Sequence, residues 1–324
     1  MTEFELIARL TAQLPAGPSV IVGVGDDCAV LDLGHPDKWF LYKTDAVVEG
    51  VHFTTDAPPE KVGRKALARC LSDVAAMAGR PTHALVTMAL PRSFDSARVE
   101  AVFNGIKALA AEHQTLLVGG ETTTCPERML ISIALLGEVE RGKAVLRSGA
   151  QAGDAIFVTG ELGGSLSGKH LDFEPRLAEA AWLAGHFSIH SMIDLSDGLA
   201  GDLPHILKAS QVGAELLSKT IPISRAAKLH TRRLTDARAS FNPSGGEHLS
   251  AKAPLEAALT DGEDFELLFT VAAKDAVPLL DQWKQQFPKL RLSCIGKITA
   301  ESGLRIRSRE GLKPLEAHGY VHFA

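Results

Sequence analysis

Strand-like and helix-like runs alternate along this chain, and that alternation limits the possible folds more than any other feature. VIVGVG at 20–25 is typical of a buried strand ending in glycine, whereas residues 58–79 have the apolar period of a helix. This alternation favours an α/β or α+β architecture over an all-α or all-β one. We expect further helices at 4–14, 94–113 and 274–287, and strands within 39–50, 83–91, 115–120, 129–139, 155–165, 191–203, 265–271, 291–298 and 303–308.

The pattern begins again after Arg147, which indicates two domains. A length of 324 residues also suggests two, since domains of about 150 residues are common. We place the boundary in the turn-rich stretch 147–153 and expect an N-terminal domain at 1–148 and a C-terminal domain at 149–324. Residues 230–250 have no apolar period and are rich in turn-forming residues, so we expect a long loop there.

The charge balance and the cysteines exclude several classes of protein. The chain has 34 basic and 39 acidic residues, a net charge of −5, which gives no electrostatic footprint for nucleic acid or for an anionic membrane. No apolar run reaches the length of a membrane span. Four scattered cysteines without a CxxC pair favour reduced thiols in a cytoplasmic protein over disulfides or a zinc site.

Acidic residues cluster beside glycines at the ends of apolar runs. Each cluster alone is ordinary turn or helix-cap chemistry. Five in one chain favour a shared ligand site, because ligands gather at strand ends in open α/β folds. The clusters are Gly25-Asp26-Asp27, Thr44-Asp45, Gly119-Gly120-Glu121, Asp194-Leu195-Ser196-Asp197-Gly198 and Asp261-Gly262-Glu263-Asp264.

Asp73 extends this pattern into a helix. At 100° per residue it falls between Val62 and Ala66, inside the apolar stripe and away from a face carrying Lys65 and Arg69. A carboxylate facing the core must be paired or bind a metal. A buried Asp–Arg pair or a cap is one interpretation. The other is that Asp73, Asp27 and Asp45 meet around Mg²⁺, which prefers oxygen ligands.

The familiar nucleotide and hydrolase fingerprints are missing from the sequence. GxxxxGK[ST], GxGxxG, HRD, DFG, HExxH and GxSxG do not occur. The glycine-rich stretch 159–165 is compatible with an anion cradle and equally with a plain turn. His52 comes directly after an acidic strand. Its side chain either contacts a ligand or has a structural role.

Together these segments resemble the thiamine-monophosphate kinase family, of the superfamily that includes aminoimidazole ribonucleotide synthetase and selenophosphate synthetase. The most specific match is Thr44-Asp45-Ala46-Val47-Val48-Glu49-Gly50-Val51-His52-Phe53. Further matches, in order along nearly the whole chain, are residues 25–31, 65–77, 119–123, 147–150, 193–199, 262–270 and 319–323.

The resemblance implies Mg²⁺-dependent transfer of the γ-phosphoryl group of ATP to thiamine monophosphate. It also implies an N-terminal mixed sheet with helices that forms a barrel with its mate in a homodimer, and a C-terminal α/β domain. No general base is assigned, because an ionised phosphate acceptor needs none. The implied ligands of several Mg²⁺ ions are Asp27, Thr44, Asp45, Asp73, Glu121, Asp194 and Asp197; those of ATP are Gly120, Glu121, Arg147 and Ser196; those of thiamine phosphate are His52, Glu263 and Tyr320.

Several positions depart from the family pattern. Glu121 stands where Asp is usual, Asp261 replaces the first glycine of GGED, Gly164 replaces an Asp, and 166–176 is short. Two alternatives remain open at this point. One is a sister ATP-dependent synthetase acting on another small acceptor, and the other is a non-catalytic protein that binds nucleotide or thiamine phosphate.

Overall fold

The computed structural model describes residues 3–15, 17–229 and 252–316, which form two compact units. The first unit contains residues 3–146 and 171–186, and the second contains 147–170 and the chain from 187 onward. The units therefore divide between 146 and 147, and one later segment returns to the first unit. The domain bounds of 1–148 and 149–324 stay a prediction. Tyr320 and the loop expected at 230–250 lie outside the described residues.

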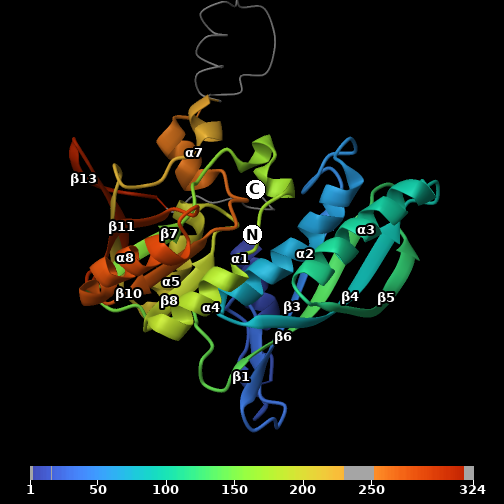
Figure 1. Cartoon of the computed structure of the whole chain (residues 1–324), viewed down its shortest axis with the longest axis horizontal. Coiled ribbons are helices and arrows are strands. Elements are labelled where there is room, and N and C mark those ends of the chain that lie inside the picture. Colours follow the sequence, from blue (N-terminus) through green and yellow to red (C-terminus); the bar gives the residue numbers. More distant parts are fainter. Residues whose placement is uncertain (1–2, 16, 230–251, 317–324) are drawn as a thin grey trace, which may run out of the picture. The chain divides into compact units, whose positions relative to one another are not determined.

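The first unit is built on a six-stranded sheet with the order β1-β2-β3-β6-β4-β5. Neighbouring strands are antiparallel except β4 and β5, which are parallel. Figure 1 shows helices α2 and α3 side by side across this sheet. The elements of the first unit are α1 (Glu3–Thr11), β1 (Val20–Val22), β2 (Ala29–Leu31), β3 (Lys38–Val48), α2 (Pro59–Ala76), β4 (Arg80–Leu90), α3 (Ser96–Glu112), β5 (Leu116–Thr124), β6 (Leu130–Glu140) and α4 (Leu177–His186).

Two glycines let α2 and α3 approach closely. A Cβ atom at Gly63 of α2 would lie 1.8 Å from the Val102 carbonyl oxygen, and one at Gly105 of α3 would lie 1.9 Å from the Glu60 carbonyl oxygen. Neither carbonyl can move without disturbing its own helix, so only glycine fits at these crossings. The close contact fixes the spacing between the two helices.

One face of the first sheet packs on helices, and the other leaves apolar side chains exposed. On the helical side, Leu41 and Ile133 are completely buried. On the opposite side, Tyr42 is 52% exposed and Leu85 is 44% exposed. This difference follows from the two-residue alternation of strands, which sends neighbouring side chains to opposite faces.

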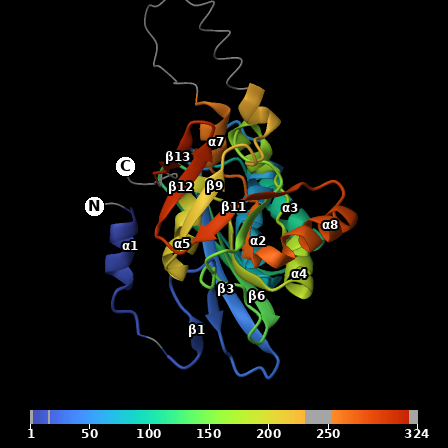
Figure 2. The same cartoon turned by 90° about the vertical axis from the view of Figure 1, so that its left-hand side faces the viewer.

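The second unit has a seven-stranded sheet with the order β13-β12-β9-β11-β7-β10-β8. Strands β7 and β10 are buried at every residue, which is typical of strands covered on both faces. Figure 2 shows β13, β12, β9 and β11 in this order. The elements are β7 (Ala155–Thr159), β8 (Ile189–Asp194), α5 (Leu199–Ser210), β9 (Gly213–Leu217), α7 (Pro254–Thr260), β10 (Leu267–Val271), α8 (Ala276–Gln286), β11 (Leu292–Thr299), β12 (Gly303–Ser308) and β13 (Gly311–Pro314), with short 3₁₀ turns at Ser165–Ser167, Lys169–Leu171 and Ala273–Asp275.

The predicted fold class is confirmed, since each unit combines a mixed sheet with helices. The barrel formed with a mate stays a prediction. The expectation of a buried strand at 20–25 is wrong: β1 has only three residues, pairs with β2 alone at the sheet edge, and leaves Ile21 40% exposed. Among the described residues, no helix combines the length and the hydropathy needed to cross a membrane.

Candidate active site

Charged side chains of helix α2 and strand β3 meet at the interface between these two elements. Lys43 Nζ donates to Asp73 Oδ1 at 2.8 Å, and Arg69 Nε donates to Asp45 Oδ2 at 3.2 Å. Alternate residues of a strand share a face, so Lys43 and Asp45 both point toward α2. Lys65, Arg69 and Asp73 follow one another at four-residue spacing and form one stripe on α2. We call these three residues the charged stripe of α2.

The helical period predicts the burial of Asp73 correctly but places Lys65 and Arg69 wrongly. Asp73 is 7% exposed, as expected of a carboxylate within the apolar stripe. Lys65, however, is only 1% exposed, and the Arg69 side chain is 14% exposed. Successive members of the stripe are about 40° apart on the helix, so the face that packs on β3 is wide enough for all three. The structure shows a buried pair of Asp73 with Lys43, whereas the sequence suggested a pair with an arginine.

Asp27 brings a second buried carboxylate close to Asp73. Asp27 lies two residues after Gly25, which has a φ of +122°, and it is only 2% exposed. A carboxylate oxygen of Asp27 and one of Asp73 lie within 4.8 Å of each other. Two buried carboxylates this close repel each other unless a cation lies near them. Oxygen donors at this separation suit Mg²⁺, so this part of the predicted metal set fits the ion chemically.

The electrostatics of this interface show the same crowding of negative charge. Burial lowers the pKa of Lys43, but the charges of Asp73 and Asp45 outweigh it and hold that pKa above its usual value. Burial, followed by the Asp73 charge, raises the pKa of the Cys28 thiol well above its ordinary value. Cys28 is therefore a neutral thiol, and its backbone N–H donates to Met77 Sδ at 3.1 Å.

Thr44 and Glu121 lie apart from these carboxylates within the first unit. Thr44 alternates with Asp45 along β3, so its side chain is on the exposed face, with its Oγ1 3.4 Å from Ser132 Oγ. Glu121 pairs with Thr87, which pairs with Ser132, so these side chains form one polar row across the same face. Strands β3 and β5 are three strand spacings apart, about 14 Å.

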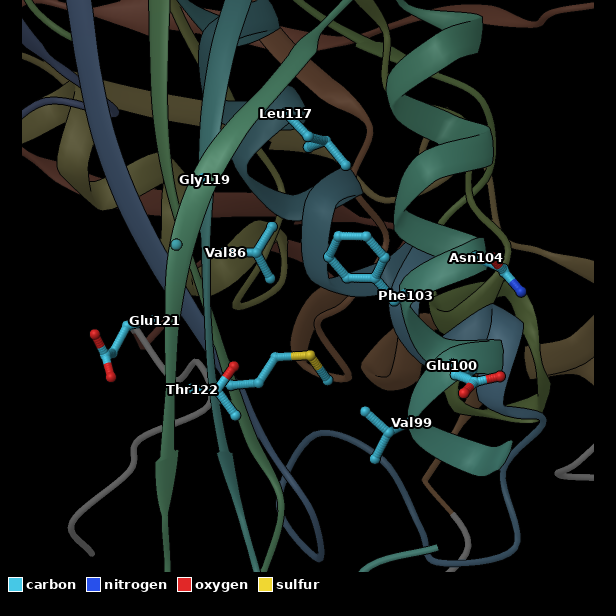
Figure 3. A pocket seen from close by; sticks show the side chains of 11 residues that line it. Val86, Val99, Glu100, Phe103, Asn104, Leu117, Gly119, Glu121 and Thr122 are labelled. Atoms are coloured by element: carbon cyan, nitrogen blue, oxygen red, sulfur yellow. The ribbon is translucent and has the colours of Figure 1, made fainter. Parts of the chain in front are cut away.

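A cavity of about 570 Å³ lies between α3 and strands β4 and β5. Figure 3 shows the Phe103 ring projecting from α3 toward β5, and the Glu121 side chain pointing away from Phe103. Gly120 contributes to the opposite wall, where a Cβ atom would lie 1.8 Å from the Val86 carbonyl oxygen. Gly120 was predicted to contact ATP, whereas Phe103 was missed. An aromatic residue in an amphipathic helix looks like ordinary core, so no sequence signal marks it.

Carboxylates also gather in the second unit, where β8 runs into α5. Asp194 ends β8 and is 4% exposed, and Ser196 and Asp197 follow in the turn before α5. Asp202, which sequence reasoning missed, accepts a hydrogen bond from the Asp197 backbone N–H at 3.0 Å. Burial, then the charges of Asp197 and Asp194, raises the pKa of Asp202 well above its usual value. The signal for Asp202 was its position in the first turn of a helix, where acidic residues are favoured.

Arg147 belongs to the same neighbourhood of the second unit. Its positive charge acts on Asp202 and lowers the pKa of that carboxyl, and it also contributes to lowering the pKa of His205 to about 4, an effect led by burial. Ser210 at the end of α5 donates to the Arg147 carbonyl oxygen at 3.3 Å and accepts from the Ala150 N–H at 3.1 Å. Of the predicted nucleotide contacts, Ser196 thus lies just before the start of α5, and the Arg147 backbone lies near its end.

The glycine-rich loop at 159–165 gives its backbone donors to carboxylates of this chain. The Gly163 N–H donates to both oxygens of Asp264 at 3.0 Å, and the Gly164 N–H donates to Asp261 Oδ2 at 2.9 Å. The Ser165 hydroxyl also donates to Asp264. Of the two interpretations of this loop, the structure supports the structural one. Gly164 and Asp261, two departures from the family pattern, therefore contact each other.

His52 and Glu263, the remaining predicted contacts, lie in tight turns. His52 is half-buried in the turn after β3, and its Nδ1 accepts from the Val48 N–H at 3.1 Å. Glu263 has a φ of +57°, and its N–H donates to the Ser196 carbonyl oxygen at 2.7 Å. The backbone thus ties Glu263 to the turn that carries Ser196 and Asp197.

Comparison with known proteins decides the family. Residues 25–139 match the family model of the AIR synthase related protein, N-terminal domain, and residues 151–308 match that of its C-terminal domain. The thiamine-monophosphate kinase of Rhodopirellula baltica is 38% identical over 328 residues, covering 99% of this chain and 97% of the relative. This chain belongs to the thiamine-monophosphate kinase family.

Further relatives of the thiamine-monophosphate kinase family agree over the full length. The enzyme of Bacillus subtilis is 33% identical, with 100% of both chains covered. A solved structure described as AaThiL complexed with AMPPCP and TMP has a TM-score of 0.81 and 30% identity, and covers 99% of this chain and 97% of its own. The family resemblance predicted from the motifs is confirmed, and so is the mixed α/β fold that it implies.

Proposed function

We propose that this chain transfers the γ-phosphoryl group of ATP directly to thiamine monophosphate, giving thiamine diphosphate, in a Mg²⁺-dependent reaction in the cytoplasm. The observation that carries the proposal is the pair of buried carboxylates of Asp27 and Asp73, within 4.8 Å of each other in a member of the thiamine-monophosphate kinase family. The solved relative in complex with AMPPCP and TMP supports the same two substrates. Four cysteines without a disulfide fit a reducing compartment.

The chain's own residues would bind and position the reactants. Asp27, Asp45 and Asp73 in the first unit, and Asp194 and Asp197 in the second, would hold the magnesium ions through carboxylate oxygens. Bound Mg²⁺ supplies neutralisation of the phosphate charge that develops during transfer. Arg147 adds a fixed positive charge, and His52 and Glu263 would orient the acceptor. Positioning and charge neutralisation account for most of the catalysis of phosphoryl transfer, so we assign no general base.

The cavity between α3 and β5 is the best candidate for the base of ATP. Its volume of about 570 Å³ is within the range of small-molecule pockets. The Phe103 ring offers a flat apolar surface on which a purine can stack. Gly120 lies in the opposite wall, where it has no side chain. Of the predicted nucleotide contacts, Gly120 lines this cavity, and Glu121 borders it although its side chain points away from Phe103.

We also propose a homodimer formed through the exposed face of the first sheet. That face presents the large apolar side chains Tyr42 and Leu85, which a second copy of the sheet would cover. Thr44 and Glu121 lie on the same face but about 14 Å apart. A second copy would bring additional carboxylate or hydroxyl neighbours to each of them.

The decisive experiment is a panel of phosphorylated acceptors with γ-labelled ATP and Mg²⁺. We expect label in thiamine diphosphate, with one ADP formed for each product molecule, and no transfer after chelation of Mg²⁺. Intact nucleotide binding without thiamine diphosphate would refute the proposal. Release of labelled inorganic phosphate with a different acceptor would favour a sister synthetase.

The substitution Asp45→Asn tests the metal role in the same assay. We expect turnover to fall by about 100-fold or more, because a neutral amide replaces a charged oxygen ligand. Asp37→Asn, an exposed residue just before β3, is the matched control and should leave turnover unchanged. Circular dichroism and thermal melting establish that both variants are folded. Unchanged turnover in the folded Asp45→Asn variant would remove Asp45 from the metal set.

A further inference from the structure

Lys65 is a buried cation inside the layer where α2 packs on the sheet. Its side chain is among the largest fully buried ones in the described part of the chain, with 1% exposure. Lysine is almost never fully buried unless it is paired, because its ammonium group is strongly hydrated. Here Lys65 Nζ donates to the carbonyl oxygen of His52 at 2.7 Å. The ammonium group therefore binds backbone of the turn that follows β3.

Hydrogen bonds to both its backbone and its ring hold His52 in place. Its backbone N–H donates to the Val48 carbonyl oxygen at 2.9 Å, and its ring Nδ1 accepts from the Val48 N–H at 3.1 Å. Its carbonyl oxygen accepts from Lys65. Two of these bonds are local to the turn, whereas the bond to Lys65 ties the turn to α2, thirteen residues further along the chain. Loss of the Lys65 bond would remove this link between the turn and α2.

The bond at Nδ1 determines which ring nitrogen carries the proton. A ring nitrogen that accepts from a backbone N–H is unprotonated, so the proton of neutral His52 is on Nε2. Nε2–H is then a hydrogen-bond donor with a fixed direction. A donor of this kind suits an anionic oxygen, such as that of a phosphate monoester.

We propose that Lys65 is a positioning residue for the phosphate acceptor. It holds the His52 turn so that Nε2–H points at an oxygen of the acceptor's phosphate, and it does so from within α2 without touching the acceptor. This inference rests on the proposed function, in which His52 contacts thiamine monophosphate. It adds a buried residue of α2 to the determinants of acceptor binding and leaves ATP binding to other residues.

The test compares Lys65→Met with Lys61→Met. Lys61 lies one turn earlier on α2, is 44% exposed and pairs with Asp172 on the surface, so it is a matched control. We expect Lys65→Met to raise KM for thiamine monophosphate about 10-fold, with KM for ATP within about two-fold of the unsubstituted enzyme. Lys61→Met should change neither. Equal rises in both KM values for Lys65→Met would overturn the proposal, because they would indicate a general structural role.

A double-substitution cycle with His52→Ala separates the two levels of inference. If Lys65 acts through His52, Lys65→Met should have little further effect on KM for thiamine monophosphate in the His52→Ala background. A full effect in that background contradicts the inference about Lys65. If His52→Ala alone leaves this KM unchanged, the proposed contact of His52 with the acceptor fails instead.

A measurement on the unsubstituted protein guards against a Lys65→Met variant that does not fold. ¹⁵N-labelled histidine distinguishes the two ring tautomers by nitrogen chemical shifts. We expect His52 as the Nε2–H form, with a shift of the Nε2 resonance when thiamine monophosphate is added. The Nδ1–H form, or no change on adding thiamine monophosphate, would overturn the inference.

Discussion

Carboxylates of the two units are held in different ways. In the first unit, side-chain cations bind two of them: Lys43 pairs with Asp73, and Arg69 pairs with Asp45. In the second unit, backbone N–H groups donate to Asp202 and Asp264, although the buried Glu266 there pairs with Lys169. A side-chain cation is a full charge on a flexible chain, whereas a backbone N–H is a fixed dipole. The pairing with a side-chain cation would allow a metal ion to replace that cation, whereas the backbone donors hold a loop in one conformation.

The comparison predicts a large loss of stability when Lys43 is replaced. Lys43→Met leaves the Asp73 carboxylate buried without its cation, so the free energy of unfolding should fall by about 4 kcal/mol when divalent cations are chelated. Under the proposed function Mg²⁺ binds the same carboxylates, so added Mg²⁺ should restore part of that loss. Urea denaturation with chelator and with Mg²⁺ measures both values.

Lys38→Met provides the control for Lys43→Met. Lys38 is on the same strand and pairs with Glu138 at 2.8 Å, but its side chain is 40% exposed. We expect a loss below about 1 kcal/mol and no recovery with Mg²⁺. Equal losses of unfolding free energy in the two variants would show that the Lys43–Asp73 pair behaves like the exposed Lys38–Glu138 pair.

An intermediate effect is expected from the pH dependence of Asp264. Burial raises the pKa of this carboxyl to about 6, against the opposing effects of Lys169, Ser165 and the Gly163 N–H. The folded state therefore binds the proton more tightly than the unfolded chain does. Stability is greater at low pH and is lost as the pH rises from about 4 to about 6, by about 2 kcal/mol.

Asp264→Asn isolates that contribution, since an amide does not titrate. Chemical denaturation between pH 4 and pH 6 should show a flatter pH profile for the variant than for the unsubstituted protein. Asp281→Asn, at an exposed position of α8, is the control and should keep the original slope. Parallel profiles for all three proteins would show that backbone donors keep Asp264 ionised throughout.

The smallest effect is expected at the surface pair of Lys61 and Asp172. Its nitrogen–oxygen distance of 2.8 Å matches that of Lys43 and Asp73, but its side chains are 44% and 53% exposed. Lys61→Met should change the free energy of unfolding by less than about 0.5 kcal/mol, and high salt should remove even that difference. A larger change would mean that this pair holds residues 171–186 to the rest of the first unit.

The sequence predicts the carboxylates of these sites better than their partners. Asp73 was identifiable because a charge inside an apolar stripe breaks a local periodic pattern, and Asp27 because glycine and two acids follow a strand. Lys43 was not identifiable as the partner of Asp73, because the two are thirty residues apart and the pairing depends on how α2 crosses β3. Lys65 was assigned to the wrong side of the helix, because the width of the face of α2 that packs on β3 also depends on that crossing.

Contacts distant in the sequence account for most of what remained unpredicted. Gly164 and Asp261 are 97 residues apart, and nothing local in either segment indicates their hydrogen bond. Phe103 lines a cavity only because α3 packs beside β5. The alternation of strands and helices predicted both mixed sheets, but it gave no strand order and did not reveal that β1 is a short edge strand.

The close crossing of α2 and α3 has a consequence for anyone redesigning nucleotide choice. Gly105 lies two residues from Phe103 on α3, and its contact with the Glu60 carbonyl sets how closely α3 lies against α2. The position of one wall of the cavity thus depends on a contact with the neighbouring helix, away from the residues that line the cavity. An engineer who wants room for a bulkier base should first alter the packing of α3 on α2 at Gly105 and Gly63, and only then the residues that line the cavity.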